Sequence, residues 1–166
     1  MKGKLLVSIA LGIILCLGVG FLAGQATQMS VNTWYVTLEK PFFTPPGWLF
    51  TPVWTMLYLL MGIAVGRVWY FGKHYNWGKT AIYYFCLQLL VNALWSLVFF
   101  GLRNPIAGLA VILLLFFLII KTLQQFRGID VWAMRLLYPY LIWVFFATLL
   151  NLGIVILNFL YIKNAT

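Results

Sequence analysis

Residues 105–124 read PIAGLAVILLLFFLIIKTLQ, a stretch in which Lys121 is the only charged side chain. A run of about 20 apolar residues is what a helix needs to span the hydrocarbon core of a bilayer. Similar runs lie on both sides of it, and together the five runs cover residues 5–26, 48–71, 80–101, 105–124 and 133–161. They lack the alternation of apolar and polar residues that transmembrane strands require. The sequence therefore predicts an all-α integral membrane bundle of five helices, forming one domain over residues 1–166.

The composition of the chain excludes two broad classes of protein. Of its 166 residues, 64% are hydrophobic and 8% are charged, and the mean hydropathy is +1.01. Ordinary soluble domains contain about 25% charged residues, and a domain of this size exposes too much surface to hide such an apolar excess. Disordered chains are poor in apolar residues. A soluble globular enzyme and a disordered chain are both excluded.

The basic residues predict how the helices are oriented. The net charge is +9, from 11 basic and 2 acidic residues. These basic residues lie between the apolar runs or near their ends instead of forming one stripe, which argues against a nucleic-acid partner. The side that holds the N-terminus carries Lys2, Lys4, Arg67, Lys73, Lys79, Lys121, Arg127 and Arg135, and the other side carries Lys40, Arg103 and Lys163. By the positive-inside rule, we expect a cytoplasmic N-terminus and an outward-facing C-terminus in a cell membrane.

The first apolar run has two interpretations. It follows Met1-Lys2-Gly3-Lys4, as a signal peptide would, and Gly24-Gln25-Ala26 is a weak cleavage site. Its length exceeds the usual signal core of about 7–15 residues, which favours a retained helix. Small residues recur at every fourth position of this run, at Ser8, Gly12, Cys16, Gly20 and Gly24. Another helix could pack closely on that face. Together with Gly62 and Gly66 of the second run, it could serve internal packing or dimerisation.

The connection between the first two runs is a long loop rich in proline and aromatic residues. Residues 40–47 read KPFFTPPG, and three prolines prevent a regular helix. Long loops in compact bundles often serve as lids, and Trp34, Pro45 and Pro46 are the candidate lid residues. The alternative is a loop that rests on its aromatic side chains in the lipid headgroup region.

The ionisable residues offer no conventional catalytic set. Glu39 and Asp130 are the two carboxylates and His74 is the one histidine. The expected topology puts these two carboxylates on opposite membrane faces, so they cannot act as an acid–base pair. Cys16 and Cys86 lie in apolar runs without metal-ligand spacing. We therefore expect no metal site, no required cofactor and no hydrolytic chemistry. Since no charged residue lies deep within a helix, ion-coupled transport is also disfavoured.

Two helical faces combine aromatic residues with uncharged amides. The third run aligns Gln88, Asn92, Trp95, Ser96 and Phe99, and the fifth aligns Trp143, Ala147, Asn151 and Asn158, with Tyr140 at the edge. Amides are costly in hydrocarbon unless they are paired, so both faces should point inward. They could be interhelical hydrogen-bonding residues or the walls of a ligand cavity. The residues alone do not choose between these roles.

The same residues occur in a recognisable order. The loop and second run contain Trp34-Tyr35, Lys40-Pro41, Pro45-Pro46, Pro52-Val53-Trp54 and Leu57-Tyr58. The third run contains Gln88-Leu89-x-x-Asn92-x-x-Trp95-Ser96 and Phe99-Phe100-Gly101, and the fifth contains Arg135-Leu136-Leu137-Tyr138-Pro139-Tyr140, Trp143, Ala147 and Leu150-Asn151. From about residue 30 onward, this series resembles the translocator protein family, also called tryptophan-rich sensory proteins or peripheral-type benzodiazepine receptors.

The resemblance implies a function as well as a fold. It implies five helices around one pocket covered by the first loop, a homodimer, and binding of porphyrins such as protoporphyrin IX, of benzodiazepine-type drugs and, in some members, of cholesterol. Pocket residues carried over by position are Trp54, Asn92, Trp95, Trp143, Ala147, Leu150 and Asn151. A porphyrin receptor or sensor of tetrapyrrole level is the first expectation. Light- and oxygen-dependent porphyrin degradation, with Trp54 and Trp143 as the catalytic residues, and ligand transport are the alternatives.

The chain departs from the family pattern in the fourth run. Members of the family often carry a tryptophan and, one turn later, an acidic residue at positions that are Ala107 and Val111 here. One pocket wall is therefore expected to be wider and less polar. A loose sterol-binding pattern, which is a weak signal, is present as Leu157, Tyr161 and Lys163.

Overall fold

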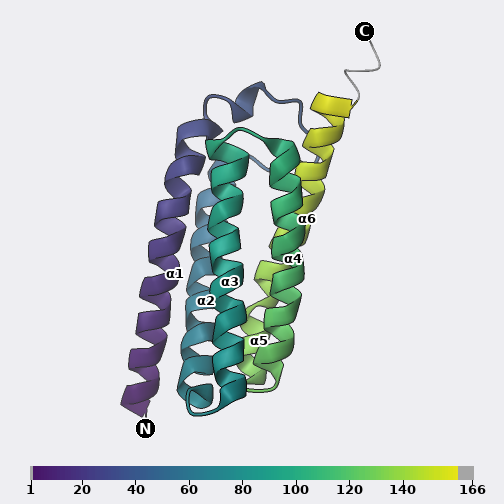
Figure 1. The fold of residues 1–166 in the computed structure, drawn as a ribbon. Coiled ribbons are helices and arrows are strands. Elements are labelled where there is room, and N and C mark those ends of the chain that lie inside the picture. The colour runs from purple at the N-terminus through teal and green to yellow at the C-terminus, as the bar shows by residue number, and fades with distance from the viewer. Residues whose placement is uncertain (1, 161–166) are drawn as a thin grey trace.

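The computed structural model describes residues 2–160. Every secondary-structure element among these residues is a helix or a helical turn. Five helices are long and apolar enough to cross a membrane, which makes this a multi-pass membrane protein of the predicted all-α class. They form an elongated bundle (Figure 1). The long helices are α1 (Lys2–Val31), α2 (Phe50–Gly72), α3 (Asn76–Ser96), α4 (Pro105–Arg127) and α6 (Tyr138–Val155), with the short α5 (Val131–Leu136) before α6.

Several helices extend beyond the predicted apolar runs. The first run was expected to end at residue 26, but α1 continues through polar residues to Val31 and includes the possible cleavage site. Short elements complete the ends of the bundle: the 3-10 turns η1 (Tyr35–Thr37) and η2 (Gly47–Leu49), and the π-helical turns η3 (Leu97–Gly101) and η4 (Ile156–Leu160). Hydropathy marks the part of a helix that crosses hydrocarbon, whereas backbone hydrogen bonding continues into the headgroup region.

The fifth span consists of two helices. Leu137 separates α5 from α6, and Pro139 occupies the first turn of α6. A proline has no amide hydrogen to donate to the preceding turn, which breaks the helix there. Asp130 caps α5, since its Oδ1 accepts hydrogen bonds from the backbone nitrogens of Trp132 (2.9 Å) and Ala133 (3.3 Å).

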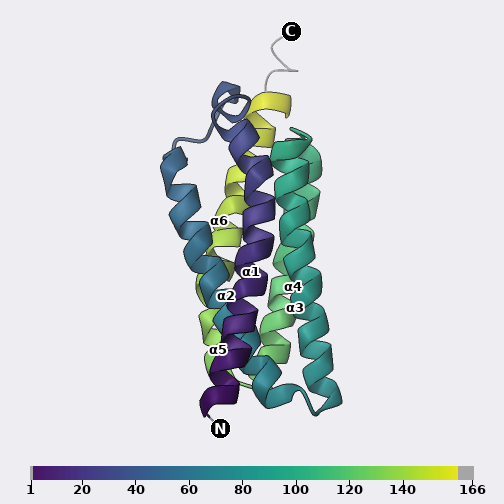
Figure 2. The same ribbon diagram turned by 90° about the vertical axis from the view of Figure 1, so that its left-hand side faces the viewer.

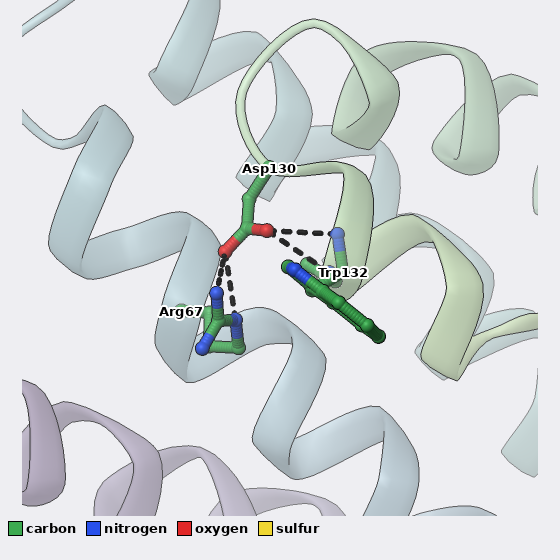
Figure 3. A network of polar contacts seen from close by, with 4 residues as sticks. Arg67, Asp130 and Trp132 are labelled. Atoms are coloured by element: carbon green, nitrogen blue, oxygen red, sulfur yellow. Dashed lines mark hydrogen bonds and ion pairs between the residues drawn. The ribbon is translucent and has the colours of Figure 1, made fainter.

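Asp130 also ties the start of this span to α2. Its Oδ2 accepts hydrogen bonds from Nε and Nη2 of Arg67, both at 2.7 Å (Figure 3). The Asp130 side chain is buried and that of Arg67 is partly exposed. One carboxylate thus caps a helix and pairs with a guanidinium, which fixes the connection between α4 and α5 against α2 at the end of the bundle that holds the N-terminus.

Helices α1 and α2 make their closest approach at glycines. A Cβ atom on Gly62 would lie 2.5 Å from Cα of Ile13, and one on Gly66 would lie 2.5 Å from Cα of Ile9. Gly12 faces the backbone of Gly62 and Gly66 in return. The small-residue faces of both helices therefore serve internal packing here. Nearer the first loop, α2 leans away from α1 (Figure 2).

Candidate ligand-binding pocket

A large cavity lies where α1 and α2 diverge. It has a volume of about 430 Å³, within the range of about 300–1,000 Å³ typical of small-molecule sites. It is lined by Leu17, Gly20, Phe21, Ala23, Gly24, Gln25, Thr27, Gln28, Phe50, Thr51, Trp54, Thr55, Tyr58, Trp95, Ser96 and Phe100. The exposed residues Phe21, Gln25, Thr51 and Thr55 form its mouth, so the cavity opens sideways between two helices.

Aromatic rings form the inner wall of this large pocket. The ring centroid of Trp54 lies 6.2 Å from that of Trp95 and 5.8 Å from that of Tyr58. The ring centroid of Trp95 in turn lies 5.6 Å from that of Phe99. These spacings are typical of aromatic pairs, which give a rigid apolar surface. Trp54 and Trp95, two of the predicted pocket residues, both line this cavity.

A buried hydrogen-bond chain supports this wall from behind. Tyr58 Oη donates to Oδ1 of Asn92 at 2.9 Å, and Nδ2 of Asn92 donates to Tyr140 Oη at 2.7 Å. Tyr140 Oη donates in turn to Oε1 of Gln88 at 2.9 Å. The chain joins α2, α3 and α6. Asn92 was expected in the pocket, but it does not line either cavity: it holds Tyr58, which does.

A second, much smaller cavity contains most of the remaining predicted residues. Its volume is about 20 Å³, and it is lined by Tyr35, Phe50, Trp95, Phe99, Phe100, Ala147, Leu150, Asn151 and Ile154. Phe50, Trp95 and Phe100 also line the large pocket, so these three side chains separate two adjoining spaces. Five of the seven predicted pocket residues are thus divided between the two cavities.

Asn151, an amide on the predicted face of α6, also has hydrogen-bond partners in the bundle. In the amide orientation that satisfies both groups, Nδ2 of Asn151 donates to the carbonyl of Pro105 (2.9 Å), and its Oδ1 accepts from the nitrogen of Leu109 (3.1 Å). Asn151 therefore joins α6 to the first turn of α4. Asn151 also lines the small cavity, so the hydrogen-bonding role is present, and a role in ligand binding stays a prediction.

Trp143 lies further from the cavities than the resemblance implied. Its ring centroid is 6.2 Å from that of Phe50 and 5.5 Å from that of Phe146, and it is absent from the lining of both cavities. Phe50 stands between Trp143 and the pocket. The indole could contact a ligand only if Phe50 moved aside.

The contribution of α1 to the pocket was missed from the sequence. Gly20, Phe21, Gly24 and Gln25 form one side of it, whereas every candidate pocket residue came from the later helices. The small residues at every fourth position of α1 could have indicated that this helix takes part in the pocket. Near Gly62 this face packs against α2, and further along Gly20 lies against the ring of Tyr58, whereas Gly24 borders open space.

The first loop crosses the end of the bundle and is tied to η4, the continuation of α6 (Figure 1). Asn158 donates from Nδ2 to the carbonyl of Glu39 (2.8 Å), and its Oδ1 accepts from the nitrogen of Glu39 (2.9 Å). Tyr35 packs inward over the small cavity, whereas Phe42 is fully exposed. The loop therefore covers the site and also directs an aromatic side chain outward.

The predicted lid residues differ in their contacts. Trp34 packs against Phe99, with ring centroids 5.8 Å apart. Pro45 and Pro46 line neither cavity. Instead, Pro46 precedes η2 in an extended conformation, which sets the turn that leads into α2. Trp34, which also lines neither cavity, packs against a side chain of the small cavity, whereas these two prolines shape the loop.

Replacing Asn158 with alanine is expected to loosen the loop without unfolding the bundle. The substitution removes both hydrogen bonds to Glu39, each worth about 1 kcal/mol. Amide hydrogen exchange at Glu39 should then accelerate about tenfold. Hydrogen–deuterium exchange of residues 36–44 tests this, with Asn76→Ala at the opposite end of the bundle as the control. Unchanged exchange in the Asn158 variant would contradict the role assigned to Asn158.

The two carboxylates and the other metal-ligating residue types are dispersed over the part of the chain that the structure describes. Glu39 lies in the first loop and Asp130 at the opposite end of the bundle (Figure 1), which precludes an acid–base pair. Among residues 2–160, no group of three or more histidine, cysteine or carboxylate side chains could hold a metal ion. Within this part of the chain, the pocket offers aromatic surface and neutral hydrogen-bonding groups.

Comparison with known families now accounts for this arrangement. A family model described as the TspO/MBR family matches residues 12–157. The chain belongs to this family. The resemblance inferred from the tryptophan, proline and amide motifs is thereby confirmed, and the match includes most of α1, which those motifs did not cover.

Relatives from distant organisms align over most of the chain. The Tryptophan-rich protein TspO of Chlorobaculum tepidum is 43% identical over 155 residues, covering 93% of this chain and 98% of the relative. The protein of the same name from Archaeoglobus fulgidus is 45% identical over 146 residues, covering 88% and 94%. The Translocator protein of Homo sapiens is 36% identical over 119 residues, covering 71% and 70%.

Two expectations specific to this family member concern α4 and the C-terminal residues. Ala107 and Val111 line neither cavity, so the wall they were expected to widen is not part of these spaces. Asn104 caps α4 through a 3.0 Å bond from the nitrogen of Ala107. Of the sterol-binding pattern, Tyr161 and Lys163 lie outside the described residues.

Proposed function

We propose that this protein is a membrane receptor that binds porphyrins such as protoporphyrin IX, along with other hydrophobic ligands, in the large pocket. The observation that carries the proposal is the inner wall of Trp54, Trp95 and Tyr58 around a cavity of about 430 Å³. A flat aromatic macrocycle stacks on such rings and buries a large apolar area. Binding at this site would let the protein act as a sensor or regulator of tetrapyrrole level.

The polar groups of the pocket suit the substituents of the macrocycle. Gln25, Gln28 and Thr51 line the pocket and are exposed, so they can donate hydrogen bonds to the carboxylates of a porphyrin while its ring lies deeper. His74 lies between α2 and α3 at the opposite end of the bundle, far from the place where an axial ligand of haem would be needed. A free porphyrin therefore suits the site better than ligated haem, and binding requires no other cofactor.

The orientation and assembly of the receptor follow from the same proposal. The bias of basic residues favours a cytoplasmic N-terminus, which puts the first loop and the mouth of the pocket in the outer half of the membrane. The bilayer supplies the hydrophobic ligand, and a homodimer is the proposed assembly. Cysteine accessibility to a membrane-impermeant reagent, with cysteine introduced at Thr37 or at Asn76, tests the orientation.

Light-dependent degradation of the porphyrin, with oxygen as the oxidant, is the second candidate, and one observation favours it. The ring of Trp54 lies within 6.4 Å of the rings of Tyr58, Trp95 and Tyr140, so an indole oxidised by an excited porphyrin would have aromatic neighbours. Illumination should then produce a new absorption band that is lost in Trp54→Phe and in Trp143→Phe. A transporter would instead move porphyrin into sealed liposomes.

Replacing Trp54 with phenylalanine is expected to weaken porphyrin binding about three- to tenfold. The variant keeps an aromatic ring but loses stacking area, and aromatic pairs contribute about 0.5–1.5 kcal/mol beyond area burial. Titration of protoporphyrin IX in darkness, followed by its absorption, measures the affinity. Trp69→Phe is the control, because Trp69 is exposed and lies toward the other end of α2. Equal affinities in all three proteins, or no saturable binding, would refute the proposed site.

A further inference from the structure

The hydroxyl of Tyr35 is an exception among the buried polar groups. The residue is 5% exposed, and Oη has no hydrogen-bond partner among the described residues. Burying a hydroxyl without a partner destabilises the fold, and such groups in folded proteins call for an explanation. A phenylalanine would fill the same space without this cost, so the oxygen itself needs a role.

The ring of Tyr35 is held firmly by its neighbours. Its centroid lies 5.6 Å from that of Phe100, 6.2 Å from that of Phe99 and 6.3 Å from that of Phe50. The ammonium nitrogen of Lys40 lies 5.2 Å from the same centroid. With three rings and a cation around it, the side chain has little freedom to turn its hydroxyl toward another partner.

The space next to Tyr35 is large enough for one polar group. Tyr35 lines the small cavity, whose volume of about 20 Å³ exceeds the roughly 10–15 Å³ that a water-sized group needs. The cavity adjoins the large pocket across Phe50, Trp95 and Phe100, which line both. To reach the small cavity, a substituent on a ligand in the large pocket therefore has to pass only these three side chains.

The chemistry of Tyr35 defines what that substituent would be. Burial raises the pKa of its hydroxyl to about 12, so the proton remains on Oη at neutral pH and can be donated. Lys40 adds a positive charge nearby. A neutral donor beside a cation favours an oxygen acceptor, and a negatively charged oxygen most of all.

We propose that Tyr35 determines ligand specificity by donating a hydrogen bond to a carboxylate or carbonyl oxygen that extends from the large pocket into the small cavity. The proposal rests on the proposed function, since it assumes a ligand in the large pocket. It makes the first loop part of the binding site, because the loop supplies the donor. Ligands with an oxygen-bearing substituent are then preferred over purely hydrocarbon ligands of the same shape.

The test compares Tyr35→Phe with the unchanged protein on two porphyrins. Protoporphyrin IX carries two carboxylates, and etioporphyrin has alkyl substituents alone around the same macrocycle. The variant should bind protoporphyrin IX about tenfold more weakly or worse, and etioporphyrin as tightly as the unchanged protein does. Tyr83→Phe is the matched control, because Tyr83 is exposed on α3, away from both cavities.

Three results would overturn the proposal, and each has a distinct pattern. Equal weakening toward both porphyrins would mean that the hydroxyl supports the fold or binds a water molecule. No weakening toward either would leave it without a role in binding. A lower melting temperature of ligand-free Tyr35→Phe would reveal an existing partner for the hydroxyl. If the unchanged protein binds neither porphyrin, the proposed function itself fails. That outcome differs from the three results above, which all concern the Tyr35→Phe variant.

Discussion

Replacing Gly62 with leucine should disrupt the packing of α1 on α2 and lower the free energy of unfolding by about 3 kcal/mol, the upper part of the usual range for overpacked sites. A Cβ at this position would lie 2.5 Å from Cα and 2.7 Å from the nitrogen of Ile13. Both atoms belong to the backbone, so no change of rotamer relieves the clash, and the helices must separate. Thermal unfolding in detergent, followed by circular dichroism, measures the loss.

The control for this substitution is Gly18→Leu in α1. Gly18 is exposed, and a Cβ there would have no atom within 4 Å. Leucine also has a higher helix propensity than glycine, so this variant should unfold no earlier than the unchanged protein. If both variants were equally stable, the close approach of α1 and α2 described above would be wrong.

Replacing Asn92 with leucine is expected to be the second most damaging change. Leucine preserves the volume of the side chain but leaves the hydroxyls of Tyr58 and Tyr140 without the partner they share. Buried unsatisfied groups cost about 1–3 kcal/mol each in soluble proteins, whereas hydrogen bonds within membranes average about 0.6 kcal/mol. We therefore expect a loss of about 2 kcal/mol in the free energy of unfolding, measured by denaturation in mild detergent.

A second substitution separates the hydrogen bonds from packing. Tyr58→Phe in the Asn92→Leu background removes one orphaned hydroxyl, so it should recover part of the loss. In the unchanged background, Tyr58→Phe should be destabilising, since Asn92 then loses a donor. Additive effects of the two substitutions would contradict a hydrogen-bond chain. Porphyrin binding should weaken in Asn92→Leu because Tyr58, which lines the pocket, loses its anchor.

The sequence was sufficient to predict the five spans because each apolar run is long enough to cross a bilayer. The helix ends were harder, since polar residues such as Thr27 and Gln28 continue α1 beyond its apolar run. The break at Leu137 was not predicted either, although Pro139 supplies its cause. Local hydropathy reports burial in lipid, and it is insensitive to where a backbone stops being helical.

The pocket could be predicted in part. Helical spacing placed Trp95 and Asn92 on one inward face. In the structure Trp95 lines a cavity, whereas Asn92 takes part in a buried hydrogen-bond chain. Which of the two occurs depends on the neighbouring helix, and spacing within one helix does not contain that information. The separation of Trp143 from the pocket by Phe50 likewise depends on side-chain packing between α2 and α6.

The sideways mouth of the pocket has a consequence for how affinity should be expressed. A ligand that enters between α1 and α2 comes from the hydrocarbon phase, so the concentration that governs occupancy is moles of ligand per mole of lipid. A dissociation constant quoted per litre of water would change with the amount of lipid or detergent in the sample. Two laboratories could then report different affinities for the same protein while measuring the same equilibrium.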